Sequence, residues 1–258
     1  MTSAATFTAA ARRRGFSLVE LLVVVSILTL LLALLTPSLQ RARALARDSV
    51  CRSNLSQLNR AHSAYTVNSR GEFFPYNGGI IYMAFLEKYH NIHEIRLCPD
   101  AAKPFYPTAS ARGGSRNAWQ AWSRRGSYGV NGWIYNPTDA STNSNAGGRA
   151  YPCCSNRPFP DAWWKGIGDV GYPGLTPSYA DSNWVDGWPW WDDIVPPVLD
   201  GSITDPNERF QMCRFCFDRH DMAVNVAFLD GHADHVPLGR LWTLMWSKLH
   251  QPSEREIP

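Results

Sequence analysis

The longest apolar stretch of the chain runs from residue 16 to residue 35 and contains one charged residue, Glu20. As a helix, these 20 residues would span about 30 Å, the thickness of the hydrocarbon core of a bilayer. Moving their Leu, Val, Ile and Phe side chains into lipid is favourable by about 4.5–9 kcal/mol, whereas one ionised side chain costs about 3 kcal/mol. We therefore expect a transmembrane helix over residues 16–37 rather than the buried core helix of a soluble protein.

The pattern becomes amphipathic after Pro37, and a continuation of the same helix is expected over residues 38–67. Proline removes a backbone hydrogen bond, so Pro37 should bend or loosen this helix, and the polar run 68–71 favours its end. Apolar residues recur at the spacing of one helical face. That face contains Cys51, Leu55, Leu58, His62 and Tyr65, with His62 expected as a packed histidine rather than a metal ligand.

The end of the chain predicts a β-hairpin over residues 220–238. Residues 223–229 alternate, Asp230-Gly231 is a strong two-residue turn, and residues 232–236 form the returning strand. In this register Leu229 pairs with His232 and Val226 with His235, and a mostly apolar face packs on the long helix. This face contains Val224, Val226, Phe228, Ala233 and His235. A short closing helix is expected over residues 238–249.

The middle of the chain, residues 100–212, shows no sustained periodicity and is rich in Trp, Gly, Pro, Asn and Asp. This composition predicts a large loop-rich insertion of turns and short strands with buried aromatic side chains. The alternative is that exposed tryptophans, such as Trp190 and Trp191, bind a glycan or a protein. Together the elements predict an α+β fold, with the long helix packed on a small antiparallel sheet and residues 68–258 as the globular domain.

Charge and composition narrow the functional classes. The net charge of +3 equals the contribution of the three arginines at 12–14, so the remainder of the chain has a net charge of zero. No basic stripe of the kind that binds nucleic acid is present, and no nucleic-acid partner is expected. The 11 tryptophans provide burial that disordered chains lack. We also find no nucleophile–base, phosphate-loop or zinc-protease motif, so no enzyme is expected.

Residues 12–22, Arg-Arg-Arg-Gly-Phe-Ser-Leu-Val-Glu-Leu-Leu, closely resemble the type IV prepilin signal. The resemblance implies a leader over residues 1–15, cleavage by prepilin peptidase between Gly15 and Phe16, and methylation of the new amine of Phe16. It also implies that Glu20 meets the terminal amine of a neighbouring subunit during assembly, and that Pro37 perturbs the helix. Three alternatives remain: a signal peptide cut after Ala46, a twin-arginine signal, and an uncleaved anchor.

Further motifs are similar to a bacterial group of prepilin-type proteins related to type II secretion pseudopilins. They are Cys51-x-x-Asn54-Leu55-x-Gln57-Leu58, the segments 97–100 and 127–131, and the C-terminal His220-x9-Asp230-Gly231 signature. The resemblance implies a pilin-like fold. It also makes Cys51–Cys98 the first disulfide to consider, with two free thiols as the alternative.

The six cysteines, at 51, 98, 153, 154, 213 and 216, permit three disulfides if the chain is exported. Cys213-x-x-Cys216 could form a disulfide or bind a metal ion through both sulfurs. Zinc or calcium could also bind near the hairpin, although the Asp-Gly pair is already explained as a turn. The candidate ligands there are His220, Asp230, His232 and Asp234.

These features together predict a structural subunit of a pseudopilus or pilus that assembles in type II secretion or in a related fibre. The expected partners are prepilin peptidase, like subunits and the bacterial inner membrane, which the chain would cross once. The leader arginines are matched by Arg41, Arg43 and Arg47, so the charge pattern alone does not set the orientation. The resemblance places the C-terminal domain in the periplasm or in a fibre. The alternative is a membrane-tethered glycan- or protein-binding protein that does not polymerise.

Overall fold

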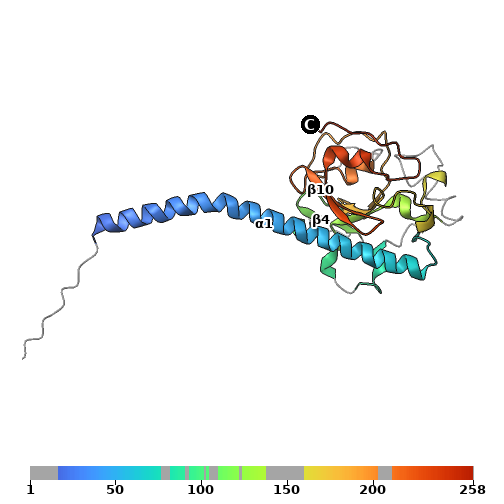
Figure 1. The fold of residues 1–258 in the computed structure, drawn as a ribbon, viewed down its shortest axis with the longest axis horizontal. Helices are drawn as coiled ribbons and strands as arrows, with labels where there is room; N and C mark the ends of the chain where they lie inside the picture. Colours follow the sequence, from blue (N-terminus) through green and yellow to red (C-terminus); the bar gives the residue numbers. More distant parts are fainter. Residues whose placement is uncertain are drawn as a thin grey trace, which may run out of the picture. The chain divides into compact units, whose positions relative to one another are not determined.

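The computed structural model describes residues 17–76, 82–90, 93–101, 103–104, 110–121, 124–137, 160–202 and 211–257. The chain divides into two compact units, with the boundary between Leu45 and Ala46. One helix, α1 (Leu18–Asn68), contributes to both units (Figure 1). The leader, including Gly15 and Phe16, lies outside the described residues.

In the first unit, the residues of α1 up to Leu45 are all exposed. The helix contains an 18-residue window of mean hydropathy 2.9, so it is long and apolar enough to cross a membrane. Pro37 lies inside the helix without ending it. Beside it, the Thr36 hydroxyl donates to the carbonyl of Leu32 at 2.7 Å, and the Ser38 hydroxyl to the carbonyl of Leu35 at 2.8 Å. Such side-chain bonds are a common way to satisfy carbonyls near a proline in a lipid-exposed helix.

In the second unit, the predicted apolar face of α1 is confirmed. Cys51, Leu55, Leu58 and His62 are buried, and the His62 ring stacks on Phe74 with centroids 4.4 Å apart. Burial lowers the pKa of His62 to about 3, so this histidine is a neutral packing residue. The helix ends as predicted: Gly71 has a φ of +91° and its N–H donates to the Thr66 carbonyl at 2.8 Å.

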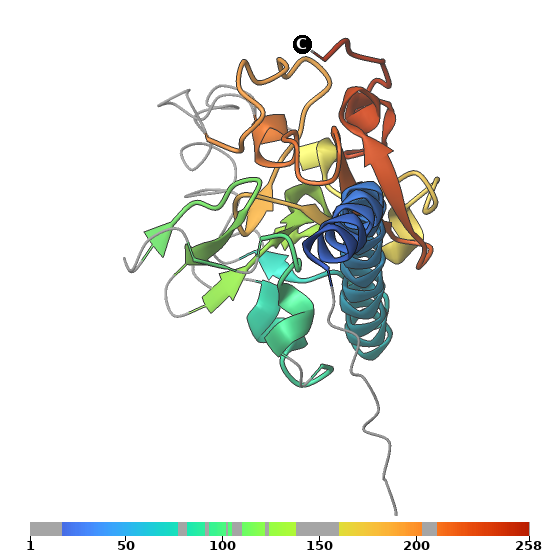
Figure 2. The ribbon, with the colours of Figure 1, turned by 90° about the vertical axis from the view of Figure 1, so that its left-hand side faces the viewer.

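A five-stranded sheet in this unit has the order β11-β10-β8-β6-β9. Figure 2 shows the ribbon from a second direction. All neighbours are antiparallel except β6 and β9. The Asn59 side chain on α1 donates to the Phe228 carbonyl on β10 at 2.6 Å, so the helix lies against the sheet. The expected α+β fold is therefore confirmed. The strands are β6 (Tyr128–Asn131), β8 (Pro177–Asp181), β9 (Asp186–Gly187), β10 (Ala223–Phe228) and β11 (Ala233–Pro237).

Shorter elements surround this sheet. A four-stranded sheet contains β2 (Lys103–Pro104), β4 (Asn117–Ala121), β3 (Ser110–Ala111) and β5 (Arg124–Gly126). A parallel pair joins β1 (Pro75–Tyr76) to β7 (Asn136–Pro137). The helices are α2 (Tyr82–Leu86) and the 3₁₀ turns η1 (His93–Arg96), η2 (Gly132–Ile134), η4 (Pro160–Ala162), η5 (Ile167–Asp169), η6 (Gln211–Arg214) and η7 (Leu238–Thr243).

The middle of the chain contributes the central strands of the main sheet. Strands β6, β8 and β9 all lie within residues 100–212, so this segment is part of the sheet and not only an insertion beside it. Periodicity is absent because both faces of β8 are buried, which removes the polar alternation of a half-exposed strand. The prediction that aromatic side chains are buried is confirmed. The buried tryptophans are Trp119, Trp133, Trp163, Trp164, Trp188, Trp190, Trp242 and Trp246.

The terminal hairpin is present, but its predicted register is wrong by one residue. Val226 pairs with Asp234 and Asn225 with His235, because the turn has three residues instead of two. The Gly231 N–H donates to the Phe228 carbonyl and the Phe228 N–H to the His232 carbonyl, both at 2.9 Å. A one-residue slip exchanges the faces of the returning strand.

The β10 side chains on the face that meets α1 therefore differ from the prediction, whereas His235 of β11 lies on this face as predicted. Asn225 donates to the Asp48 carboxylate of α1 at 2.7 Å, and His235 lies 3.5 Å from the same carboxylate. Tyr179 of β8 contacts His62 from this face as well, with their rings 5.7 Å apart. The predicted closing helix is limited to the 3₁₀ helix η7, which ends at Thr243.

Candidate functional site

Two regions of the chain carry functional chemistry, and the first is the start of α1. The Ser17 N–H donates to the Glu20 carboxylate at 2.9 Å, and the Glu20 N–H donates to the Ser17 hydroxyl at 3.2 Å. This reciprocal pair is a capping box, which satisfies two N–H groups that a helix start otherwise leaves free. Glu20, the fifth residue after the predicted cleavage site, thus caps the start of α1, which begins at Leu18.

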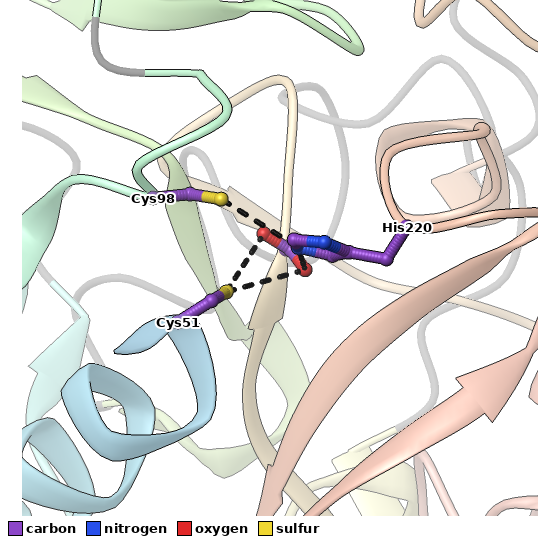
Figure 3. Close-up of side chains that lie close together, drawn as sticks. Cys51, Cys98 and His220 are labelled. Carbon is purple, nitrogen blue, oxygen red and sulfur yellow. Dashed lines mark hydrogen bonds and ion pairs between the residues drawn. The ribbon is translucent and has the colours of Figure 1, made fainter. Parts of the chain in front are cut away.

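The second region is a buried cluster of four potential ligands in the second unit, namely Cys51, Cys98, Asp181 and His220 (Figure 3). Cys51 lies on α1, Cys98 follows η1, Asp181 ends β8, and His220 precedes β10. Residues two apart on a strand share a face, so Asp181 points toward α1 as Tyr179 does. The ligand atoms of all four residues lie within 4.8 Å of one another.

Distances within the cluster show how the side chains face one another. The Cys98 sulfur lies 3.5 Å from His220 Nε2, and the Cys51 sulfur lies 3.7 Å from both carboxylate oxygens of Asp181. His220 Nε2 is 3.2 Å from Asp181 Oδ2. The imidazole therefore uses one nitrogen to contact both a thiol and a carboxylate.

Asp181 is fully buried and is held by fixed donors. Arg219, also fully buried at its side chain, donates from Nη1 to Asp181 Oδ1 at 2.8 Å, and the Asn225 N–H donates to Oδ2 at 2.8 Å. Burial alone would raise the pKa of Asp181, but Arg219 and His220 lower it below its ordinary value. Arg219 is fixed in turn by the carbonyls of Ser127 and Gly114, each at 2.6 Å.

The other nitrogen of His220 faces two carboxylates. His220 Nδ1 lies 3.7 Å from Asp48 Oδ1 and 3.6 Å from Asp100 Oδ2. Burial would lower the pKa of His220, but its contacts with Asp181 and Cys98 raise it to about 10. Burial also raises the pKa of Cys51, whereas a hydrogen bond with Cys51 lowers the pKa of Cys98 to about 6.

The backbone next to His220 is held in an uncommon conformation. Asp221 and Met222 have φ values of 56° and 60°, and the His220 N–H donates to the Ala223 carbonyl at 3.1 Å. Two consecutive non-glycine residues with positive φ are costly and persist only where the surroundings fix them. The Asp218 carboxylate accepts the Met222 N–H at 2.8 Å and supports the turn. This turn places His220 against the cluster.

The cluster is closed to solvent. Cys51, Cys98 and Asp181 have no exposed surface, and His220 is 6% exposed. A cysteine next to a histidine, such as Cys98 and His220, can act as a nucleophile and its base. Here, however, a substrate could not reach the sulfur, because it is fully buried. The arrangement is therefore suited to a structural role. Its donors, two sulfurs, one nitrogen and one carboxylate, are also the types that bind zinc.

The structure brings together some of the predicted site residues and separates others. Cys51 and Cys98 do come together, as free thiols, and their disulfide stays a prediction. Cys216 is buried and Cys213 is half-buried, and no disulfide joins the two. Cys153 and Cys154 lie outside the described residues.

The four predicted metal ligands near the hairpin are not gathered in one site. Asp230 and His232 pair at the exposed hairpin turn, with Oδ1 and Nδ1 2.6 Å apart, and Asp234 is exposed on β11. His220 instead joins the buried cluster, because the strained turn before β10 directs it toward α1. Asp181 and Arg219 had no motif to identify them in the sequence.

Comparison with known proteins identifies the N-terminal region. The family described as the prokaryotic N-terminal methylation motif matches residues 10–36, which include Gly15, Phe16 and Glu20. The match supports a type IV pilin-like protein that is a substrate of prepilin peptidase, and it suggests a structural subunit. Together with the exposed apolar helix, it fits a single-pass anchor in the inner membrane. No curated protein and no solved structure matches the chain.

Proposed function

We propose that the chain is a pilin-like structural subunit that assembles with like subunits, in a type II secretion pseudopilus or a related fibre. The observation that carries this proposal is the methylation motif at residues 10–36, which overlaps the start of the exposed apolar part of α1. Prepilin peptidase cuts after Gly15 and methylates Phe16. The apolar helix then holds the subunit in the inner membrane until it joins the fibre.

Glu20 has the position required for assembly. It is exposed in the single chain and follows Phe16, whose amine cleavage would free, by four positions in the sequence. A carboxylate in lipid is expensive unless a cation neutralises it, and a neighbouring subunit's terminal amine is such a cation. This need for neutralisation gives subunit association a driving force. The globular domain then lies outside the cytoplasm, in the periplasm or along the fibre.

The mature N-terminus tests the proposal directly. The full chain is produced in cells with an active prepilin peptidase and in matched cells that lack it, and its N-terminal peptide is analysed by mass spectrometry. We expect an N-methylated Phe16 in the first cells and an uncleaved leader in the second. A chain that starts at Met1 or at Arg47 in the peptidase-active cells would contradict the proposal.

The burial of Trp190 weakens the alternative of a tethered glycan-binding protein, whereas Trp191 is half-buried. Trp190 is 6% exposed, and its indole packs on Trp191 and Trp133 with centroids 4.1 and 5.2 Å away. Glycan recognition by stacking needs an exposed aromatic face. The buried tryptophans of the described residues instead form part of the core.

A further inference from the structure

We propose that Cys51, Cys98, Asp181 and His220 bind one zinc ion at the contact between α1 and the five-stranded sheet. Two thiolates, an imidazole and a carboxylate are ligands that zinc accepts in tetrahedral sites. Calcium and magnesium require oxygen ligands, so the sulfurs exclude them from this site. The inference goes beyond the proposed function and does not depend on processing at Gly15.

A tetrahedral zinc site sets the separations between its donor atoms. Zinc bonds of about 2.3 Å to sulfur and about 2.0–2.1 Å to nitrogen or oxygen place a sulfur about 3.5–3.6 Å from either lighter atom. The same bond lengths place nitrogen about 3.3–3.4 Å from oxygen.

The observed separations are close to these values. The Cys98 sulfur is 3.5 Å from His220 Nε2, and the Cys51 sulfur is 3.7 Å from Asp181 Oδ2. His220 Nε2 is 3.2 Å from Asp181 Oδ2. These three pairs would move by only a few tenths of an ångström to reach the separations of a zinc site, and all four donor atoms lie within 4.8 Å of one another.

The surroundings of the ligands are those that orient a metal site. A zinc-bound histidine usually directs its second nitrogen at a carboxylate or carbonyl, and His220 Nδ1 faces Asp48 and Asp100. Arg219 holds Oδ1 of Asp181 and leaves Oδ2 facing the imidazole. These outer contacts preset the direction of two of the four ligands.

The charges of the site would also balance. The two positive charges of zinc and the one of Arg219 offset the two thiolates and the Asp181 carboxylate, which matters because the cluster is buried. A site with four protein ligands and no solvent access is structural. Its ligands come from α1, the loop after η1, β8 and the turn before β10, so zinc would link the long helix to the sheet.

Zinc content of the full chain tests the proposal. The chain is purified in detergent, its zinc is measured by inductively coupled plasma mass spectrometry, and its cysteines are mapped under non-reducing conditions. We expect about one zinc ion per chain and no bond between Cys51 and Cys98. If the natural chain contains no zinc, or if a disulfide joins Cys51 to Cys98, the proposal is overturned.

Variants then assign the ligands. Cys98→Ser and His220→Gln should each reduce bound zinc roughly tenfold or more, whereas the matched control Cys213→Ser/Cys216→Ser should retain it. Substitution with cobalt(II) should give the absorption of a tetrahedral site with thiolate ligands, weakened in Cys98→Ser. The assignment of ligands would be refuted if Cys98→Ser or His220→Gln kept its full zinc content, or if only the control variant lost zinc.

Discussion

Two buried aspartates show how the neighbours of a carboxylate set its charge. Asp181 is paired with Arg219, and its pKa is lowered although the side chain is fully buried. Asp193 is also buried, and the N–H groups of Trp190 and Met212 donate to its Oδ2 at 3.1 and 2.7 Å. Backbone donors offset less of the desolvation, and burial raises the pKa of Asp193 to about 7.

The raised pKa of Asp193 predicts a pH-dependent stability. The folded chain holds this proton up to about pH 7, whereas the unfolded chain releases it near the ordinary pKa of about 3.9, so ionisation costs the fold stability as pH rises through this window. Asp193→Asn keeps an oxygen acceptor but cannot ionise. We expect it to increase the free energy of unfolding above pH 7 by on the order of a few kcal/mol.

Denaturant unfolding of the full chain in detergent, at about pH 4 and about pH 8, measures this difference. At the lower pH the variant and the natural chain should be nearly equal, because the natural side chain is then neutral when folded. Asp161→Asn, at an exposed side chain that is not among the groups setting the pKa of Asp193, is the control and should change neither value. An equal effect of Asp193→Asn at both pH values would contradict the assigned titration.

At the scale of elements, the turn between β10 and β11 decides which side chains face α1. The three-residue turn, residues 229–231, places Asn225 beside His235 on the face toward the helix, where a two-residue turn would have paired His235 with Val226. Gly231 closes it with a φ of +106°. A type I turn followed by a residue with positive φ is the usual form of a three-residue hairpin.

Replacing Gly231 tests this turn. A Cβ at Gly231 would contact nothing within 4 Å, so Gly231→Ala should cost only the backbone strain of positive φ, about 1 kcal/mol. Chemical unfolding gives the value. The matched control is Gly171→Ala, which also adds a methyl group in open space but has no positive φ, and should be neutral within about 0.5 kcal/mol. Equal costs at the two glycines would contradict the turn geometry.

At the scale of the whole molecule, the sequence predicts the elements better than their connections. Long-range apolar periodicity identifies α1 and its buried face, since one helix face repeats over many turns. The hairpin was also predictable, but its register was not, because Asp-Gly fits turns of two and of three residues. Strands β6 and β8 gave no alternating signal, since they are buried on both faces.

The buried cluster was predictable only in part. Cys51, Cys98 and His220 belong to motifs, but nothing in the sequence links Asp181 to them across 130 residues from Cys51. The contact arises from the order of strands in the sheet, which places β8 beside β10 and under α1. Potential metal ligands that are close in sequence, such as Asp230 and His232, were easier to predict, but these two lie at the hairpin turn and not in the cluster.

The capping box gives Glu20 a role inside its own chain, which must be separated from the proposed role between chains. Glutamine can replace glutamate in a capping box, whereas alanine cannot. Glu20→Gln therefore keeps the bond from the Ser17 N–H but removes the charge, and Glu20→Ala removes both. Neither change alters Gly15 or Phe16, so cleavage should continue in both variants.

If the Glu20 charge drives assembly by pairing with a neighbouring amine, both variants should be cleaved and both should be largely absent from the fibre. The measurement is the fraction of mature chain in the sheared or cross-linked assembly relative to the membrane, by quantitative immunoblot. A loss of about tenfold corresponds to about 1.4 kcal/mol of association free energy, which a single charge pair in lipid readily exceeds. If Glu20→Gln instead assembles like the natural chain and only Glu20→Ala fails, then Glu20 acts by starting the helix, and the charge pairing must be abandoned.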